Sequence, residues 1–258
     1  MQKTAILPLL ALAMIGLTAC GKSGSGTHAP IALPNTKPDL TNTPIKPNTS
    51  DIQGIKISIT KGKAGPDTII TDSPSINQLT INGTIIDFIP DNFNTNLEKI
   101  QKFTDKTARV SGNPFLKHTR YGYAHEGING EAYLFAQGNA TTNVPNSGTA
   151  TYVGRAVEIN KDNVARFDQR QQDISIGIIL EAAFDVDFDK KILTGTVGPS
   201  KNGRGLLQAT ISGNKFTGEH NGLSTTGQFY GDDAAELGGT YRNADGRTVG
   251  AYGAKKLN

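Results

Sequence analysis

The sequence predicts a mainly β protein that ends in an eight-stranded antiparallel β-barrel, and three observations support this fold class. From about residue 52 the chain consists of short β-like runs separated by Gly, Asn, Asp and Pro, the residues of tight turns. One run, residues 176–188, alternates apolar with acidic positions, as a strand with one buried face does. Eight such runs follow one another from residue 149, with glycines at the corners, and closure into a barrel would remove their exposed edges.

The N-terminus has the three parts of a secretory signal peptide in order. Lys3 gives a charged start, residues 5–17 are an apolar run, and a small-residue zone reads Leu-Thr-Ala-Cys up to Cys20. The apolar run is shorter than the roughly 20 residues that a transmembrane helix needs. Cys20, the only cysteine of the sequence, lies where a lipobox places the cysteine that receives a lipid. We expect residues 1–19 to be a cleaved lipoprotein signal; the alternative is an ordinary signal peptide with a cysteine near its cut site.

Residues 20–51 are predicted to be a disordered tether. They are rich in Gly, Ser, Thr, Asn and Pro and have almost no apolar clusters. Such a segment cannot bury enough surface to offset the entropy of ordering it. The residue after Cys20 is Gly21, in place of the aspartate associated with inner-membrane retention, which agrees with sorting to the outer membrane.

The next part of the chain is predicted to be a β-rich subdomain. Residues 78–81 and 84–89 have strand composition and are joined by Asn82-Gly83, the dipeptide typical of a two-residue hairpin turn. Residues 55–59 indicate a further strand. Residues 96–103 have weak helical spacing, which predicts a short helix or a turn.

Residues 147–258 carry the predicted barrel. Its strands are expected at 149–159, 176–188, 191–197, 206–212, 215–220, 225–230, 238–242 and 248–255. The apolar positions that alternation turns inward are large enough to fill a barrel of this size: Phe184, Val186, Phe188, Leu207, Ile211, Phe216 and Phe229. We therefore expect no internal ligand cavity and place function on the outside of the barrel or in the subdomain that precedes it.

Several stretches resemble the transferrin-binding protein B family. Residues 227–241, Gly-Gln-Phe-Tyr-Gly-Asp-Asp-Ala-Ala-Glu-Leu-Gly-Gly-Thr-Tyr, and the following 250–256 are similar to the family's barrel signature. Residues 146–154 look like its first barrel strand. Arg-Tyr-Gly-Tyr at 120–123 and Tyr-Leu-Phe-Ala-Gln-Gly at 133–138 resemble strands of the subdomain that the family calls the handle.

The resemblance implies a handle over residues 52–146 followed by the barrel. It also implies a surface lipoprotein of a Gram-negative bacterium, exposed on the outer membrane and delivered there by a surface lipoprotein assembly modulator. Transferrin-binding protein B has two such lobes, whereas this chain has room for one. Single-lobe relatives include factor H-binding proteins, haemoglobin-related binders and the haem-binding hemophilin group, which residues 137–150 resemble most. Hemophilin is released as a soluble protein, and this chain has a lipobox.

Candidate haem-binding residues lie together in the handle: His118, Arg120, Tyr121, Tyr123 and His125. Imidazole ligates haem iron, aromatic rings pack on the porphyrin, and a guanidinium pairs with its propionates. In a strand, His125 shares a face with the tyrosines and His118 shares one with Arg120, so both histidines reach one pocket only if the strand bends, as the intervening glycine permits. The alternative is two surface histidines on a hairpin whose tyrosines pack on the sheet.

Composition and motifs narrow the classes of function. The net charge of +3 is not clustered, so a nucleic-acid partner is not expected. The sequence has no nucleophile-elbow, Walker or HExxH motif, and no metal site beyond haem iron is predicted. The first hypothesis is a non-enzymatic surface lipoprotein that binds haem or an iron- or haem-carrying host protein, with an outer-membrane receptor as a further partner. The second is a host-protein interaction module that binds a complement regulator or acts as an adhesin. A hydrolase or other envelope enzyme is the third.

Overall fold

The structure is a computed structural model of the chain, and it describes residues 52–60, 63–87, 107–111, 116–125, 132–159, 178–198 and 205–257. The side chains of residues 107–111 and of His125 are not described. The predicted signal peptide, the tether and the expected helix or turn at 96–103 lie outside the described residues. Within the described part of the chain, no helix is long and apolar enough to cross a membrane.

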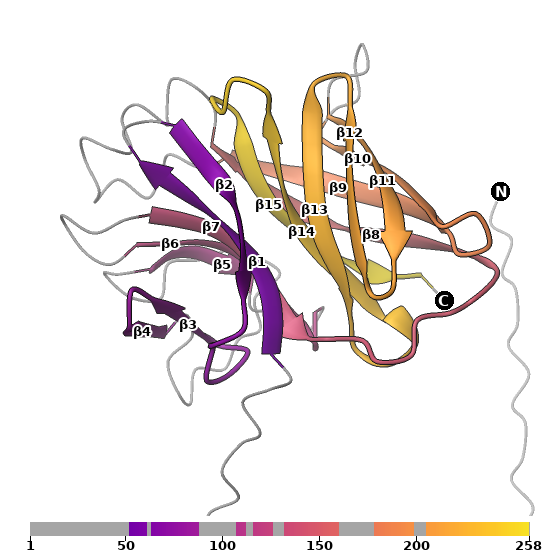
Figure 1. Cartoon of the computed structure of the whole chain (residues 1–258), viewed down its shortest axis with the longest axis horizontal. Helices are drawn as coiled ribbons and strands as arrows, with labels where there is room; N and C mark the ends of the chain where they lie inside the picture. Colours follow the sequence, from indigo (N-terminus) through magenta and orange to yellow (C-terminus); the bar gives the residue numbers. More distant parts are fainter. Residues whose placement is uncertain are drawn as a thin grey trace, which may run out of the picture. The chain divides into compact units, whose positions relative to one another are not determined.

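Eight consecutive strands close into an antiparallel barrel, which confirms the predicted fold class (Figure 1). Around the barrel they follow the order β10-β11-β12-β13-β14-β15-β8-β9. A short 3-10 turn, Asp232–Ala234, lies between β13 and β14. The barrel strands are β8 (Thr149–Ile159), β9 (Ile178–Asp187), β10 (Ile192–Val197), β11 (Leu206–Ser212), β12 (Lys215–His220), β13 (Leu223–Tyr230), β14 (Glu236–Asn243) and β15 (Val249–Lys256).

The preceding residues form the handle, a five-stranded sheet with the order β2-β1-β7-β6-β5 and a separate hairpin of β3 and β4 (Figure 1). The hairpin turns at Asn82-Gly83, as predicted, and both residues have positive φ. Pro66 lies in β2 at the edge of the sheet, where a missing N–H breaks no ladder. The handle strands are β1 (Ile52–Thr60), β2 (Lys63–Ile70), β3 (Gln78–Ile81), β4 (Thr84–Asp87), β5 (Thr107–Ser111), β6 (Thr119–His125) and β7 (Ala132–Asn139).

The barrel is filled by side chains from all of its strands. Every inward position predicted from alternation belongs to this core, which confirms that set. The core also contains Tyr152, Tyr241 and Tyr252, and the Tyr252 hydroxyl lies 2.7 Å from that of Thr225. Small residues alternate with the rings, as a narrow barrel requires. The middle of the barrel is therefore packed.

The handle sheet covers the outer face of β8 and β15. A second core joins Ile57, Tyr121 and Leu134 of the handle to Val157 and Ala251 of the barrel, together with their neighbours. Because β7 is buried here on one face and beneath the β3–β4 hairpin on the other, its residues from Ala132 to Gly138 are all buried.

Polar contacts tie the same two parts together. Asp67 of β2 accepts hydrogen bonds from the hydroxyls of Thr226 and Thr240, both at 3.1 Å. Arg242 of β14 donates a hydrogen bond to the carbonyl of Gly65. Handle and barrel thus share an apolar core, and hydrogen bonds at its edge join the two subdomains.

Candidate functional site

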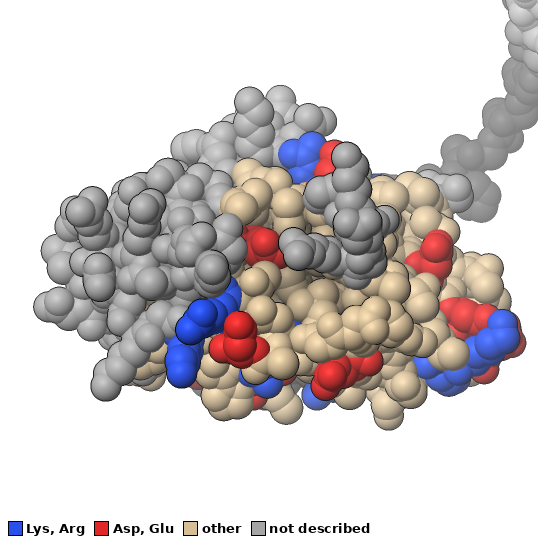
Figure 2. Space-filling view, turned by 90° about the horizontal axis from the view of Figure 1, so that it is seen from above, with Lys and Arg blue, Asp and Glu red and all other residues tan. Residues whose placement is uncertain are grey.

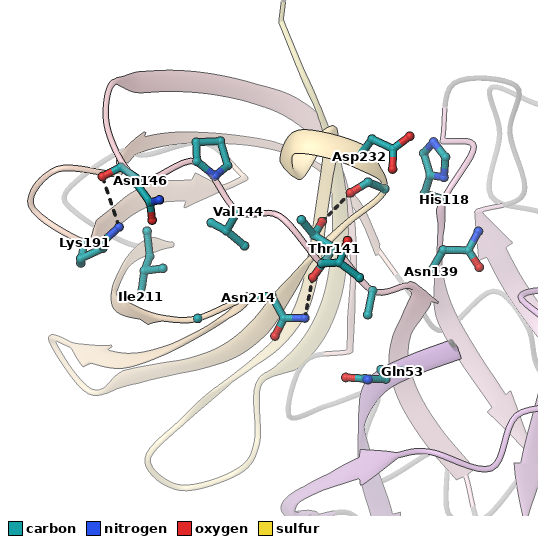
Figure 3. Close-up of a pocket in the computed structure, with 15 residues that line it drawn as sticks. Gln53, His118, Asn139, Thr141, Val144, Asn146, Lys191, Ile211, Asn214 and Asp232 are labelled. Carbon is teal, nitrogen blue, oxygen red and sulfur yellow. Dashed lines mark hydrogen bonds between the residues drawn. The ribbon is translucent and has the colours of Figure 1, made fainter. Parts of the chain in front are cut away.

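A cleft of about 1080 Å³ lies where the handle meets one end of the barrel (Figure 3). We call it the handle–barrel cleft. The handle contributes side chains from β1, β7 and the segment before β6, and the barrel contributes its turns at this end. The described residues that line it are Gln53, His118, Asn139, Ala140, Thr141, Thr142, Val144, Pro145, Asn146, Lys191, Ile211, Gly213, Asn214, Gly231 and Asp232.

The back of the cleft is formed by the chain as it passes from the handle to the barrel. The Asn139 N–H donates to the His118 carbonyl at 3.0 Å, and the Asn139 carbonyl accepts from the Gly231 N–H at 2.8 Å. Two residues further on, the Thr141 N–H donates to the Phe229 carbonyl at 3.0 Å. The connection is therefore an extension of sheet pairing onto β13, and it does not behave as a free linker.

Side chains fix the floor of the cleft in the same way. The Thr141 hydroxyl donates to the Gly231 carbonyl at 2.7 Å, and the Asn214 amide donates to the Thr141 carbonyl at 2.9 Å (Figure 3). Lys191 Nζ lies 3.5 Å from the Asn146 carbonyl, so the ammonium stays at the cleft margin (Figure 3). A site whose polar groups are already oriented loses less entropy when a ligand binds.

His118 is the described cleft residue that carries an imidazole, a ligand of haem iron. Its backbone N–H donates to Glu236 at 3.0 Å, and its half-buried imidazole lies against Gly231. A Cβ at Gly231 would lie 2.6 Å from the imidazole Cδ2, and Gly231 has a φ of 73°. Position 231 therefore requires glycine for its backbone conformation and for its contact with the ring.

The described lining presents polar and apolar surface in similar amounts, and most of its polar side chains are amides and hydroxyls. Val144, Pro145 and Ile211 are its larger apolar side chains, and the described lining residues include no Phe, Tyr or Trp. Lys191 and Asp232 give it one charge of each sign. Such a lining can form hydrogen bonds with the polar groups of a ligand over a wide area. The Lys191 ammonium can also pair with one carboxylate of the ligand.

Three of the predicted haem residues, Arg120, Tyr121 and Tyr123, do not line the cleft. Tyr121 and Tyr123 are each 2% exposed and pack in the core that joins the handle to the barrel. Arg120 donates to Asn77 Oδ1 at 3.0 Å and to the Leu116 carbonyl at 2.8 Å.

Burial lowers the pKa of the Arg120 guanidinium, and the charge of Glu236 partly opposes this. Strand β6 pairs with β7 in unbroken register as far as His125, whose side chain is not described. Of the four candidates whose side chains the structure describes, His118 alone lines the cleft. Cys20 lies outside the described residues.

Sequence reasoning did not identify Asn214, Lys191 or Glu236 as site residues. Asn214 and Lys191 occupy barrel turns, where such residues are ordinary, so spacing alone carries no signal. Glu236 is buried, whereas the acidic residues Asp232 and Asp233 before it predict a solvent-exposed turn. The described residues contain no group of three or more His, Cys, Asp or Glu side chains able to hold a metal ion. On the face drawn in Figure 2, acidic and basic side chains are interspersed among the described residues.

The barrel region is similar in sequence to a known family of barrels. Residues 144–256 match the family described as the C-lobe and N-lobe beta barrels of Tf-binding protein B. An uncharacterized protein of Haemophilus influenzae is 35% identical over 138 residues, which cover 50% of this chain and 44% of that protein.

Solved structures of transferrin-binding protein B show the same fold. The isotype 1 protein of serogroup B Neisseria meningitidis is 18% identical with a TM-score of 0.53, over 80% of this chain and 43% of that one. A mutant of the Haemophilus parasuis Hp5 protein is 21% identical with a TM-score of 0.51, over 80% and 45%.

The fold defines a single lobe built of a handle and a closed barrel. The barrel is similar to the barrels of transferrin-binding protein B, and the described handle and barrel share the fold of the solved lobes of that protein. The chain spans less than half the length of the relatives named above.

Proposed function

We propose that this chain is a non-enzymatic, lipid-anchored protein of the cell outer membrane that faces the exterior and binds a host-derived ligand for nutrient acquisition. The ligand is an iron- or haem-carrying host protein, and the handle–barrel cleft is its binding site. The observation that carries this proposal is the cleft itself: a broad recess with pre-oriented amides and hydroxyls on a lobe of the transferrin-binding protein B type.

The chemistry of the lining favours a protein surface over a small apolar molecule. Small-molecule pockets are mostly apolar and aromatic, whereas this cleft presents the side-chain amides of Gln53, Asn139 and Asn214. Protein interfaces carry about one hydrogen bond per 100–200 Å², and amides suit that density because each both donates and accepts.

The ligand class is tested by capture. The full chain is immobilised and exposed to host serum and, separately, to purified transferrin and haemoglobin in iron-loaded and iron-free forms. The proposal expects one of these carriers to bind in a 1:1 complex. Capture of a complement regulator or a cell-surface protein, with no binding of either carrier, would instead establish the alternative of a host-interaction module without a role in nutrient supply.

Direct capture of haem is the second candidate, and His118 favours it. His118 and Lys191 both line the cleft, and these residue types have the required chemistry: an imidazole ligates haem iron and an ammonium pairs with a propionate. Haemin added to the full chain should then shift its Soret band, and His118→Ala should abolish the shift while His125→Ala tests the second histidine. An unshifted spectrum in the unaltered protein rejects this candidate and leaves protein binding untouched.

Anchoring is proposed to depend on Cys20. Cys20→Ser should remove incorporation of labelled palmitate and release the chain from the outer-membrane fraction. Protease treatment of intact cells should digest the anchored protein, and deletion of the surface lipoprotein assembly modulator should protect it. Persistent protection in cells that have the modulator would place the lobe in the periplasm.

A further inference from the structure

The opposite end of the barrel holds a second pocket, of about 640 Å³, which the proposed function does not use. We call it the barrel-mouth pocket. It lies above the packed centre of the barrel, and its described lining combines Leu180, Val197 and Leu223 with the polar residues Glu158, His220 and Tyr241. The expectation of a filled barrel therefore holds for the centre, while the mouth is open.

Glu158 points into the barrel because of its place in β8. Tyr152 and Ala156, at positions of the same parity, belong to the barrel core, whereas Val157 and Ile159 pack beneath the handle. Alternation along a strand thus turns the Glu158 carboxylate toward the lumen. This inward register places a carboxylate among aliphatic side chains.

The carboxylate has a single described partner. Its Oε2 accepts a hydrogen bond from the Tyr241 hydroxyl at 2.8 Å, and Tyr241 is 1% exposed. None of the ion pairs formed among the described residues involves Glu158. By contrast, the buried carboxylate of Glu236 accepts two backbone N–H groups, from Lys117 and His118. Burial raises the pKa of Glu158, as expected for a partly buried carboxylate that forms no ion pair among the described residues.

We propose that the barrel-mouth pocket binds a small organic cation, an alkyl primary amine or guanidine, whose charged head meets Glu158 and whose aliphatic chain packs on Leu180, Val197 and Leu223. A cation offers the carboxylate charge-assisted hydrogen bonds in addition to the single described one from Tyr241. The apolar ring selects ligands that carry a short hydrocarbon chain. His220 and Tyr241 are the other titratable groups that line the pocket, and Asn243 and Thr248 supply neutral polar side chains.

The test uses the full chain with n-butylammonium as the probe and 1-butanol as its neutral counterpart. At about pH 7.5, where carboxylates are ionised, saturation-transfer NMR and calorimetry should detect butylammonium and give weaker binding of butanol. Glu158→Gln keeps an acceptor for Tyr241 and removes the charge, so it should weaken butylammonium by about tenfold or more, the factor of a charge-assisted hydrogen bond. Glu181→Gln, an exposed carboxylate of β9, is the matched control and should leave binding unchanged.

A second measurement needs no change at position 158. Binding of butylammonium should weaken as the pH falls through the pKa of Glu158, because the neutral carboxyl no longer attracts the cation. His220→Gln separates this effect from protonation of the neighbouring imidazole, and the loss should persist in that variant. The proposal is overturned if the unaltered protein gives no signal with butylammonium, or if Glu158→Gln binds it as well as the unaltered protein does.

Discussion

The carboxylate of Glu236, on the barrel, accepts the backbone N–H of His118, on the handle, at 3.0 Å. The same carboxylate accepts the N–H of Lys117 at 2.6 Å, and Glu236 is 2% exposed. A buried barrel residue therefore fixes the start of β6 and, with it, the histidine at the edge of the cleft. The site and the junction of the two subdomains depend on one set of contacts.

Replacing Glu236 by alanine should destabilise the protein. Two backbone N–H groups would lose a charged acceptor in a buried place, which costs roughly 2–3 kcal/mol in the free energy of unfolding. Urea unfolding of Glu236→Ala measures this loss, with Glu219→Ala, an exposed carboxylate of β12, as the control. Equal unfolding midpoints for the two variants would contradict the importance given to this contact.

The contact between Tyr121 and Gly253 gives a second prediction. A Cβ at Gly253 would lie 2.5 Å from Cδ1 of the Tyr121 ring and 3.0 Å from Cδ1 of Leu116. Gly253→Ala should therefore force the handle away from β15, lower stability by roughly 1–3 kcal/mol, and speed limited proteolysis within the handle. Thr210→Ala, at an exposed position of β11, should do neither. A cleavage pattern unchanged by Gly253→Ala would show that the two subdomains do not depend on this contact.

The half-buried carboxyl of Glu158 should give stability a measurable pH dependence. Burial raises its pKa above the ordinary 4.5, against the opposing hydrogen bond from Tyr241. The folded protein then holds this proton more tightly than the unfolded chain does, so the stabilisation is full below the unfolded pKa and is lost as the pH rises through the folded pKa.

Glu158→Gln stays neutral at every pH and should keep that stability. Its melting temperature should exceed that of the unaltered protein at neutral pH, and the gap should close as the pH falls toward about 4. Glu181→Gln, exposed on β9, should show no such gap. A difference between Glu158→Gln and the unaltered protein that does not vary with pH would rule out this origin.

Much of the barrel could be predicted from sequence because the pattern that defines each strand lies within the strand itself. In β9, Phe184 and Val186 alternate with Asp185 and Asp187, and this period of two fixes both the strand and its buried face. Strand β2 could not be predicted in the same way, since Gly65-Pro66 resembles a turn. It is a strand because it pairs with β1 at the edge of the sheet. The residues of β2 alone do not reveal this pairing, since it depends on a second segment of the chain.

The candidate site was predictable only in part, for a related reason. Tyr121 and Tyr123 have the composition of a haem site, but their burial follows from the packing of the handle on β15, a contact between segments about 130 residues apart in the chain. His118 precedes β6 and escapes that burial. The amides of the cleft come from handle strands and from a barrel turn that are distant in sequence, and the packing of the handle on the barrel brings Gln53, Asn139 and Asn214 to one cleft.

The most direct test of the central claim is capture of a host iron- or haem-carrying protein by cleft variants of the immobilised full chain. Thr142 is exposed in the cleft, so Thr142→Arg should obstruct it, whereas Gln208→Arg adds the same charge at an exposed position of β11 outside it. We predict that the unaltered chain and Gln208→Arg capture the carrier equally and that Thr142→Arg weakens capture by about tenfold or more, as expected when a contact region is blocked. Equal capture by Thr142→Arg and Gln208→Arg would contradict the assignment of the cleft as the binding site.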